Sequence, residues 1–189
     1  MEIGLYFGSF NPIHHGHLII AMFVQQSTPL KEVWFVVTPQ NPLKPSASLL
    51  NEHHRYFMVQ EAIQGEPSLK ASNIEFHQPR PSYTVDTLAY LREQYPQHQF
   101  SVIMGSDAYQ NFHRWKNPEV ILKNHGIVVY KRPGFEITAP NSQITVLEKA
   151  PLLQISSTHI RELIKQGKSI RYLVPQRVMD EIIQNRYYH

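Results

Sequence analysis

Two histidines, His14 and His17, lie three residues apart in the segment Gly8–His17, where a short apolar run gives way to a predicted helix. At that spacing both imidazoles project to the same side of the helix start. A neutral imidazole N–H can donate to a phosphate oxygen. The backbone N–H groups of a tight turn at Gly8 and Ser9, followed by the positive end of a helix, also attract phosphate. The segment therefore predicts a phosphate-binding site.

Other interpretations of this histidine pair are open. An H-x-x-H pair by itself is more often a pair of surface or structural histidines at a helix start. Zinc is poorly supported because the pair has no third histidine or acidic partner at a metal-ligand spacing nearby, and we predict no metal ligand. Gly16, between the two histidines, would let a ligand approach the backbone closely.

A second polar group occurs near the C-terminus, in the segment Ile155–Arg161. It follows the apolar run 152–155, interpreted as a strand, and it opens a predicted helix. Its hydroxyl residues are Ser156, Ser157 and Thr158. Capping of that helix would alone explain them. Arg161 suggests more, because a guanidinium one turn into the helix can reach phosphate oxygens held at the helix start.

Strand-like apolar runs alternate with helix-like stretches over most of the chain. The predicted strands are 3–7, 32–38, 70–76, 99–104 and 126–130, with short runs at 144–147 and 152–155; the predicted helices are 16–26, 51–64, 84–94, 157–167 and 175–186. This alternation predicts an α/β fold with a Rossmann-like, doubly wound, mostly parallel sheet and a small helical C-terminal part. We expect a single domain, 1–189, whose C-terminal helical part begins near residue 156.

Ligands of such a sheet collect at the carboxyl ends of the strands, and further polar residues lie there. Lys44, in a proline-rich loop, could meet a second phosphate. Ser82–Thr84 opens a helix that could bind a small anion such as a carboxylate. Asp107, shortly after a predicted strand, could hold a ribose hydroxyl, and Trp115 could stack on a flat ring. Taken singly, each is more often a loop, cap or core residue.

The composition narrows the class of protein. The 189 residues include no cysteine, which excludes disulfides, thiolate nucleophiles, zinc–thiolate sites and iron–sulfur clusters. The net charge is +3 and the basic residues are scattered, so we expect no nucleic-acid partner. The apolar run Leu18–Val24 is too short to span a bilayer, and the start lacks the basic region of a signal peptide. We therefore expect a cytoplasmic protein without membrane contact.

Both polar segments resemble motifs of the nucleotidyltransferase superfamily. Gly8–His17 is similar to the extended signature G-(T/S)-F-(D/N)-P-x-H-x-G-H, and Ile155–Arg161 is similar to I-S-S-T-x-(I/V)-R. With the segments named above, together with 131–134 and 172–175, the resemblance covers nearly the whole chain and is to bacterial nicotinate-nucleotide adenylyltransferases. The chain departs from the usual pattern at Phe7, Asn11 and Leu43, where relatives often have Gly, Asp and His.

The resemblance implies the transfer of an adenylyl group from ATP to nicotinate mononucleotide, which gives deamido-NAD and pyrophosphate in NAD biosynthesis. The attacking 5′-phosphate is already an anion, so no protein nucleophile is needed and catalysis is positioning plus charge stabilisation. Mg²⁺ would be held by the ATP phosphates and water. The implied partners are ATP and nicotinate mononucleotide, and the chain could form a homo-oligomer.

The resemblance also assigns residues to roles. The implied catalytic residues are His14, His17 and Arg161. The implied ATP-binding residues are Gly8, Ser9, Phe10, His14, Gly16, His17, Gly105, Asp107, Ile155, Ser156, Ser157, Thr158 and Arg161. The implied residues for the mononucleotide are Asn11, Asn41, Lys44, Ser82, Tyr83, Thr84, Asp107, Trp115 and Arg132.

Three alternatives are open. A nicotinamide-mononucleotide adenylyltransferase would use the same phosphate motifs, although an anion site at Ser82–Thr84 favours the acid. A phosphopantetheine adenylyltransferase typically has Thr at the position of His14. A catalytically dead, basic binding protein, suggested by the pI of about 9.1, would bind polyanions in a salt-sensitive way without turnover.

Overall fold

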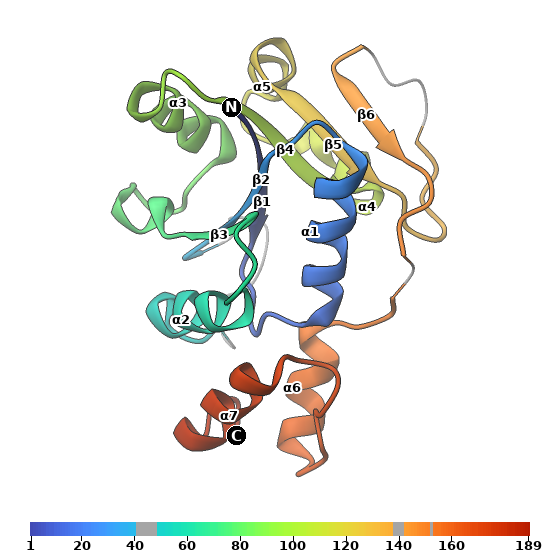
Figure 1. Cartoon of the computed structure of the whole chain (residues 1–189). Coiled ribbons are helices and arrows are strands. Elements are labelled where there is room, and N and C mark those ends of the chain that lie inside the picture. The colour runs from blue at the N-terminus through green and yellow to red at the C-terminus, as the bar shows by residue number, and fades with distance from the viewer. Residues whose placement is uncertain (41–48, 138–141, 152) are drawn as a thin grey trace.

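Six parallel strands form the centre of the protein (Figure 1), for which a computed structural model describes residues 1–40, 49–137, 142–151 and 153–189. The strands are β1 (Glu2–Gly8), β2 (Glu32–Val37), β3 (Leu69–Ser72), β4 (Gln99–Gly105), β5 (Gly126–Tyr130) and β6 (Ile144–Leu147). They follow the order β3-β2-β1-β4-β5-β6, and every neighbouring pair is parallel. The predicted Rossmann-like, doubly wound, mostly parallel sheet is confirmed.

Helices cover both faces of the sheet and one end of it. They are α1 (His15–Ser27), α2 (Glu52–Ala62), α3 (Thr84–Gln94), α4 (Ser106–Gln110), α5 (Pro118–Asn124), α6 (Ser157–Lys165) and α7 (Gln176–Asn185), with 3₁₀ turns η1 (Ile74–His77) and η2 (Phe112–Arg114). Figure 1 shows α1 on one side of the sheet and α3 and α5 on the other, while α6 and α7 lie beyond the end where β1 finishes.

The apolar runs of the strands are explained by burial on both faces. Ile3 and Leu5 of β1 belong to the core on the side of α3 and α5, whereas Tyr6 belongs to the core on the side of α1 and α2. Successive side chains of a strand point to opposite faces, so a strand covered on both sides must be apolar at nearly every position. The same alternation places Phe35 and Val36 of β2 in opposite cores.

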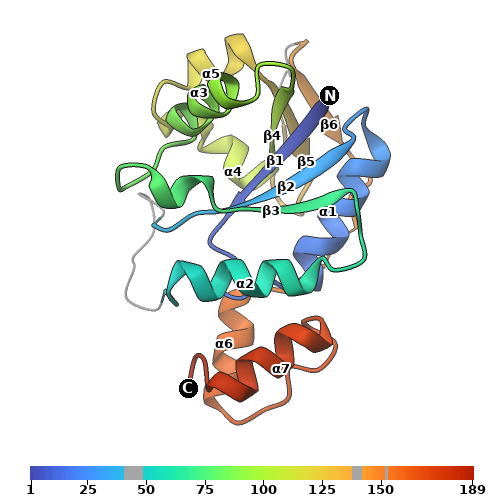
Figure 2. The same cartoon turned by 60° about the vertical axis from the view of Figure 1, so that its left-hand side comes forward.

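The last helix, α7, and the residues that follow it pack against α2. Arg177 of α7 forms an ion pair with Glu61 of α2, with 3.3 Å between Nη1 and Oε2. The Tyr187 hydroxyl lies 2.9 Å from Nδ1 of His54. Figure 2 shows α7 below α2 from a second direction, in agreement with Figure 1. These contacts hold the C-terminal part against the carboxyl end of the sheet.

Two predicted strands are wrong in part. The stretch 70–76 is strand only to Ser72 and then forms the 3₁₀ turn η1, because Glu75 turns inward to buried hydroxyls. Residues 153–155 form no strand, because this segment leads away from the edge strand β6 to the start of α6. The prediction also missed α4 and α5, which are too short to show a clear helical periodicity.

Candidate functional site

The strand order reverses between β1 and β4, and the chain segments that follow these two strands contain predicted site residues. From β1 the chain continues to β2 on one side, and from β4 it continues to β5 on the other. Such a switch point leaves a crevice at the carboxyl ends of the two strands, where ligands of open α/β sheets bind. Gly8–His17 follows β1, and Gly105–Asp107 follows β4. The fold therefore brings these two segments together.

The rings of His14 and His17 are stacked at the start of α1. Their centroids are 3.7 Å apart and their planes are inclined by 18°. The backbone N–H of His14 donates to Nδ1 of His17 at 3.3 Å. An Nδ1 that accepts a hydrogen bond carries no proton, so the proton of the neutral His17 ring is on Nε2. Edge contacts from Phe10 and Tyr6, at 5.1 and 6.2 Å between centroids, fix the orientation of this ring.

His14 is a neutral residue at neutral pH. Its side chain is buried, and burial, followed by the charges of Arg132 and His15, lowers its pKa to about 4. Gly16 makes room for the ring, because a Cβ at this position would lie 3.0 Å from Cε1 and Nδ1 of His14. The structure thus gives Gly16 a role that the sequence did not indicate, whereas close approach of a ligand at this glycine stays a prediction.

The second motif is joined directly to the first. The Ser157 hydroxyl donates to the carbonyl of Pro12 at 2.8 Å, and Nη1 of Arg161 donates to the carbonyl of Asn11 at 2.8 Å. Nη2 of Arg161 lies 3.3 Å from the Thr158 hydroxyl. A hydrogen bond from a charged donor contributes about 1.5–3 kcal/mol and a neutral one about 1. Arg161 is therefore the stronger of the two links.

Two helix N-termini consequently face the same region. Ser156 caps α6, with its hydroxyl oxygen accepting the N–H of His159 at 3.2 Å, as predicted for this segment. The first turns of α1 and α6 each present a positive dipole end, although in α1 the N–H of His15 already donates to the carbonyl of Leu173 at 3.0 Å. This arrangement, with two imidazoles and a guanidinium, can bind a chain of phosphates without a protein nucleophile.

Asp107 and Arg132 lie at the ends of β4 and β5. Nη1 of Arg132 is 3.4 Å from Oδ2 of Asp107, and Nη2 is 3.1 Å from the hydroxyl of Tyr130. The Tyr130 hydroxyl is in turn 3.1 Å from that of Tyr6. The side chains of Arg132 and Asp107 are 48% and 38% exposed. An ion pair so exposed contributes at most about 1 kcal/mol, so a ligand can compete for both groups.

The start of α3 contains the predicted anion-binding segment. Tyr83 is its N-cap residue, and Lys116 lies 4.8 Å from the centroid of the Tyr83 ring and 2.8 Å from Oδ2 of Asp86. The Ser82 hydroxyl is buried and donates to Glu75 at 2.8 Å. The N–H of Asp86 donates to the carbonyl of Tyr83, so the first-turn N–H groups that could receive an anion are those of Thr84 and Val85. Trp115 is half-buried, with its ring 5.2 Å from that of Phe112.

Sequence reasoning missed Arg55, a fully buried cation of α2. Its guanidinium donates to four backbone carbonyls, at distances of 2.6–3.0 Å; these belong to Ser9, Thr38, Pro39 and Leu50. Burial lowers its pKa to about 10, so it stays charged at neutral pH. The signal in the sequence is its spacing of three and four residues from Met58 and Val59, which places it on the buried face of the helix.

Some predictions cannot be placed. Asn41 and Lys44 lie in the segment 41–48, outside the described residues. In the described part of the chain, no group of three or more His, Asp or Glu residues could hold a metal ion. Among the same residues, no helix has both the length and the apolar character to cross a membrane.

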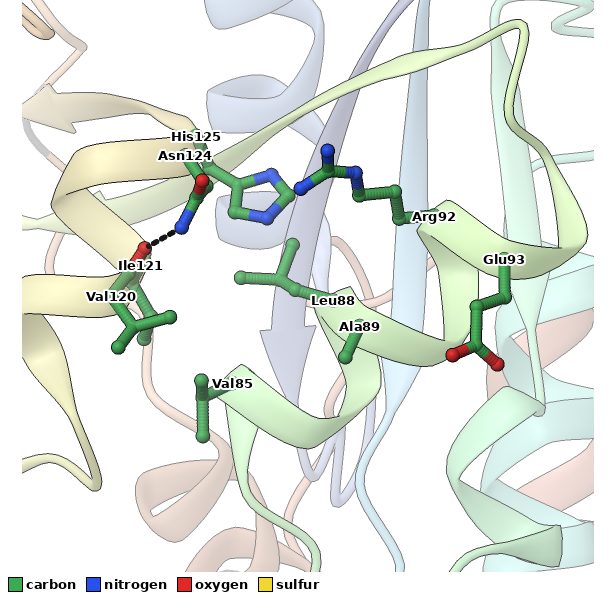
Figure 3. A pocket seen from close by; sticks show the side chains of 9 residues that line it. All are labelled: Val85, Leu88, Ala89, Arg92, Glu93, Val120, Ile121, Asn124 and His125. Atoms are coloured by element: carbon green, nitrogen blue, oxygen red, sulfur yellow. Dashed lines mark hydrogen bonds between the residues drawn. The ribbon is translucent and has the colours of Figure 1, made fainter.

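A separate hollow of about 440 Å³ lies between α3 and α5 (Figure 3). It is lined by Val85, Leu88, Ala89, Arg92, Glu93, Val120, Ile121, Asn124 and His125. Figure 3 shows the Arg92 guanidinium directed toward the His125 ring. None of the predicted site residues lines this hollow, and His125 directly precedes β5, at the opposite end of the strand from Arg132. It is therefore distinct from the switch-point site.

Comparison with known proteins shows which class of protein has this fold. The model of the family described as "Cytidylyltransferase-like" matches residues 5–163. A protein of Cytophaga hutchinsonii, named "Probable nicotinate-nucleotide adenylyltransferase", is 52% identical over 100% of this chain and 98% of its own length. One of Flavobacterium johnsoniae with the same name is 48% identical, over 100% and 99%.

Among solved structures, the nicotinic acid mononucleotide adenylyltransferase of Plasmodium falciparum complexed with NaAD has a TM-score of 0.81. It is 21% identical, with 99% of this chain and 97% of that chain covered, which supports the fold. The chain belongs to the cytidylyltransferase-like family and, within it, to the nicotinate-nucleotide adenylyltransferases.

Proposed function

We propose that this enzyme transfers the adenylyl group of ATP to nicotinate mononucleotide. A 5′-phosphate oxygen of the mononucleotide attacks the α-phosphorus, the bond between the α-phosphorus and the bridging oxygen breaks, and pyrophosphate leaves with that electron pair. The observation that carries the proposal is the convergence of two helix N-termini on one site, with Arg161 and Ser157 bonded to the backbone of Asn11 and Pro12. The names of the relatives, 48–52% identical over the full chain, supply the substrate class.

The ATP phosphates lie between the two motifs. The N–H at Nε2 of His17 donates to the α-phosphate oxygen that gains charge, and His14 assists as a neutral donor. Arg161 and the first turn of α6 hold the β- and γ-phosphates. The attacking phosphate is an anion at neutral pH, so the site needs no general base.

The mononucleotide lies toward α3 and Trp115. Asp107 accepts a hydrogen bond from a ribose hydroxyl. Arg132 contributes a positive charge to the mononucleotide site, where the ligand competes with the exposed ion pair between Arg132 and Asp107. Trp115 stacks on the pyridine ring. The backbone N–H groups at the start of α3 receive the pyridine carboxylate, because an anion is favoured at a helix N-terminus and an uncharged amide is not.

The proposal also concerns the metal ion, the domain organisation, the location in the cell and the partners of the protein. Mg²⁺ would be held by the ATP phosphates and water and would offset the phosphate charge, since among the described residues no group of three or more His, Asp or Glu could hold it. We also propose that the chain folds as a single domain and works in the cytoplasm without a nucleic-acid partner; homo-oligomer formation stays a prediction.

Replacement of Trp115 tests the assignment of the two substrates. Trp115→Ala removes the stacking surface and should raise the KM for the mononucleotide about tenfold, with little change in the KM for ATP. Trp115→Phe keeps a flat ring and should recover much of the loss. Steady-state kinetics with each substrate varied in turn provide the measurement. A change confined to the KM for ATP would show that Trp115 does not stack on the pyridine.

A further inference from the structure

Glu75 is a buried carboxylate that the reaction does not explain. It lies in η1, between the end of β3 and the start of α3, and its side chain is only 2% exposed. A buried carboxylate normally needs a cation or several hydrogen-bond donors to offset its lost hydration. No described ion pair includes Glu75, so its stabilisation must come from hydrogen bonds.

Hydroxyl groups from two different elements donate to this carboxylate. The Ser82 hydroxyl lies 2.8 Å from Oε2, and the Thr87 hydroxyl lies 2.9 Å from Oε1. Thr38, directly after β2, also hydrogen-bonds the Glu75 side chain. All three donors are buried. One side chain thus ties the start and second turn of α3 to the exit of β2.

The same position is connected to the phosphate loop. The carbonyl of Thr38 accepts Nη1 of Arg55 at 2.8 Å, and that nitrogen also donates to the carbonyl of Ser9 at 2.6 Å. A continuous set of hydrogen bonds therefore runs from Ser9, through Arg55, Thr38 and Glu75, to Ser82. It joins the segment assigned to ATP with the helix start assigned to the pyridine carboxylate.

Glu75 also determines what the α3 start presents to a ligand. The Glu75 carboxyl accepts the O–H of Ser82, which therefore points inward, and the Thr87 hydroxyl lies beside its other oxygen, although the Gln78 side-chain oxygen and the Tyr83 carbonyl are also within reach of that hydroxyl. Among the described backbone groups, the N–H donors of Thr84 and Val85 in the first turn of α3 are left for the substrate, while the Asp86 carboxylate of that turn is paired with Lys116. N–H donors alone favour a carboxylate over an amide, because the amide's own N–H groups find no acceptor there.

We propose that Glu75 is the positioning residue that sets the preference for the acid over the amide, by holding the first turn of α3 against β2. Glu75 does not touch the substrate and acts through Ser82, Thr87 and Thr38. This inference rests on the proposed function. It adds a residue that determines the specificity for the mononucleotide and leaves the binding of ATP unaffected.

The test compares the ratio of kcat/KM for nicotinate mononucleotide to that for nicotinamide mononucleotide, with the KM for ATP measured in parallel. Glu75→Gln keeps the size of the side chain but replaces one acceptor oxygen by an NH₂ group, so either Ser82 or Thr87 must turn its O–H elsewhere. We expect the ratio to fall roughly tenfold through a higher KM for the acid, with the KM for ATP unchanged.

Ser82→Ala covers the case in which Glu75→Gln fails to fold, because it removes one hydrogen bond and leaves the carboxylate in place. It should shift the same ratio in the same direction. Glu66→Gln is the matched control, since Glu66 accepts the Ser68 hydroxyl at 2.7 Å near the start of β3, and it should leave the ratio unchanged.

An unchanged ratio in folded Glu75→Gln or Ser82→Ala would overturn the inference, as would equal increases in the KM values for ATP and the acid. Absence of turnover by the wild-type protein with either mononucleotide would instead overturn the proposed function on which the inference rests.

Discussion

At the scale of single residues, the orientation of the His17 ring is fixed by its neighbours. The His14 N–H binds Nδ1, the His14 ring covers one face, and Phe10 and Tyr6 contact the ring edge-on. The same contacts that fix the ring determine its tautomer. A positioned N–H at Nε2 is the donor that a phosphate oxygen gaining charge requires.

Two substitutions of His17 separate its nitrogens. In His17→Asn the amide oxygen of the new side chain would lie near the position of Nδ1 and keep the bond from His14, but no donor would remain at the position of Nε2. This variant should therefore lower kcat about a hundredfold, as for a lost oxyanion donor. His17→Gln, whose amide N–H reaches the position of Nε2, should retain more activity. Single-turnover rates at saturating ATP provide the measurement, and equal losses in both variants would contradict a proton on Nε2.

The low pKa of His14 predicts how stability depends on pH. The folded-state pKa of about 4 lies below the usual value of 6.5, so the unfolded chain binds the proton more readily. The contribution to stability is complete above about pH 6.5 and is lost as the pH falls toward 4. In His14→Asn, which keeps a good N-cap residue, the loss of unfolding free energy between about pH 7 and pH 5 should be smaller by on the order of 1–2 kcal/mol.

Denaturant titrations at the two pH values measure this difference. His113→Asn, at an exposed position, is the matched control and should lose as much stability as the wild type. Equal losses in wild type and His14→Asn would show that His14 is not a buried neutral base.

At the scale of elements, the proposed phosphate site depends on contacts between the starts of α1 and α6, which are far apart in the sequence. The sequence motifs identified both segments, because each combines phosphate-binding residue types with a helix start. Their mutual contact was not predictable, since Ser157 and Arg161 bind the carbonyls of Pro12 and Asn11 rather than side chains. Every residue has a backbone carbonyl, so the residue types do not reveal which carbonyl accepts such a hydrogen bond.

Arg161→Lys tests this junction. A lysine has one ammonium group and cannot bind Asn11, Thr158 and a phosphate with a planar fork. We expect the KM for ATP to rise about tenfold and the unfolding free energy to fall by about 1–2 kcal/mol. Arg177→Lys in α7, which affects an exposed pair with Glu61, is the control and should change neither quantity measurably. An unchanged KM for ATP in Arg161→Lys would contradict a phosphate-binding role.

The elements that were mispredicted are short, and each has its own physical cause. Residues 74–76 have the apolar character of a strand, but buried hydroxyls draw Glu75 inward and the chain turns. Helix α5 spans seven residues and begins at Pro118, so a periodicity of 3.6 residues is barely sampled. The local pattern thus identified the long buried elements, whereas a tertiary hydrogen-bond network determined η1 and α5 was too short to be recognised.

At the scale of the whole molecule, the strand order determines which of the predicted residues can meet. The alternation of apolar runs indicated a parallel sheet, but only the structure orders the strands so that β1 and β4 are neighbours. That order unites Gly8–His17 with Asp107 and Arg132. The buried Arg55, which lies outside every motif, donates to carbonyls after both β1 and β2. It therefore joins the two chain segments that leave these strands.

The molecule as a whole should catalyse adenylyl transfer and should prefer nicotinate mononucleotide to nicotinamide mononucleotide. The purified protein would be incubated with Mg-ATP and either nicotinate mononucleotide or nicotinamide mononucleotide, and both pyrophosphate and the dinucleotide would be quantified. We expect rapid formation of deamido-NAD with the acid and little product with the amide. Absence of dinucleotide with both substrates would contradict the proposed adenylyl transfer, and equal rates with both would contradict recognition of the carboxylate by α3.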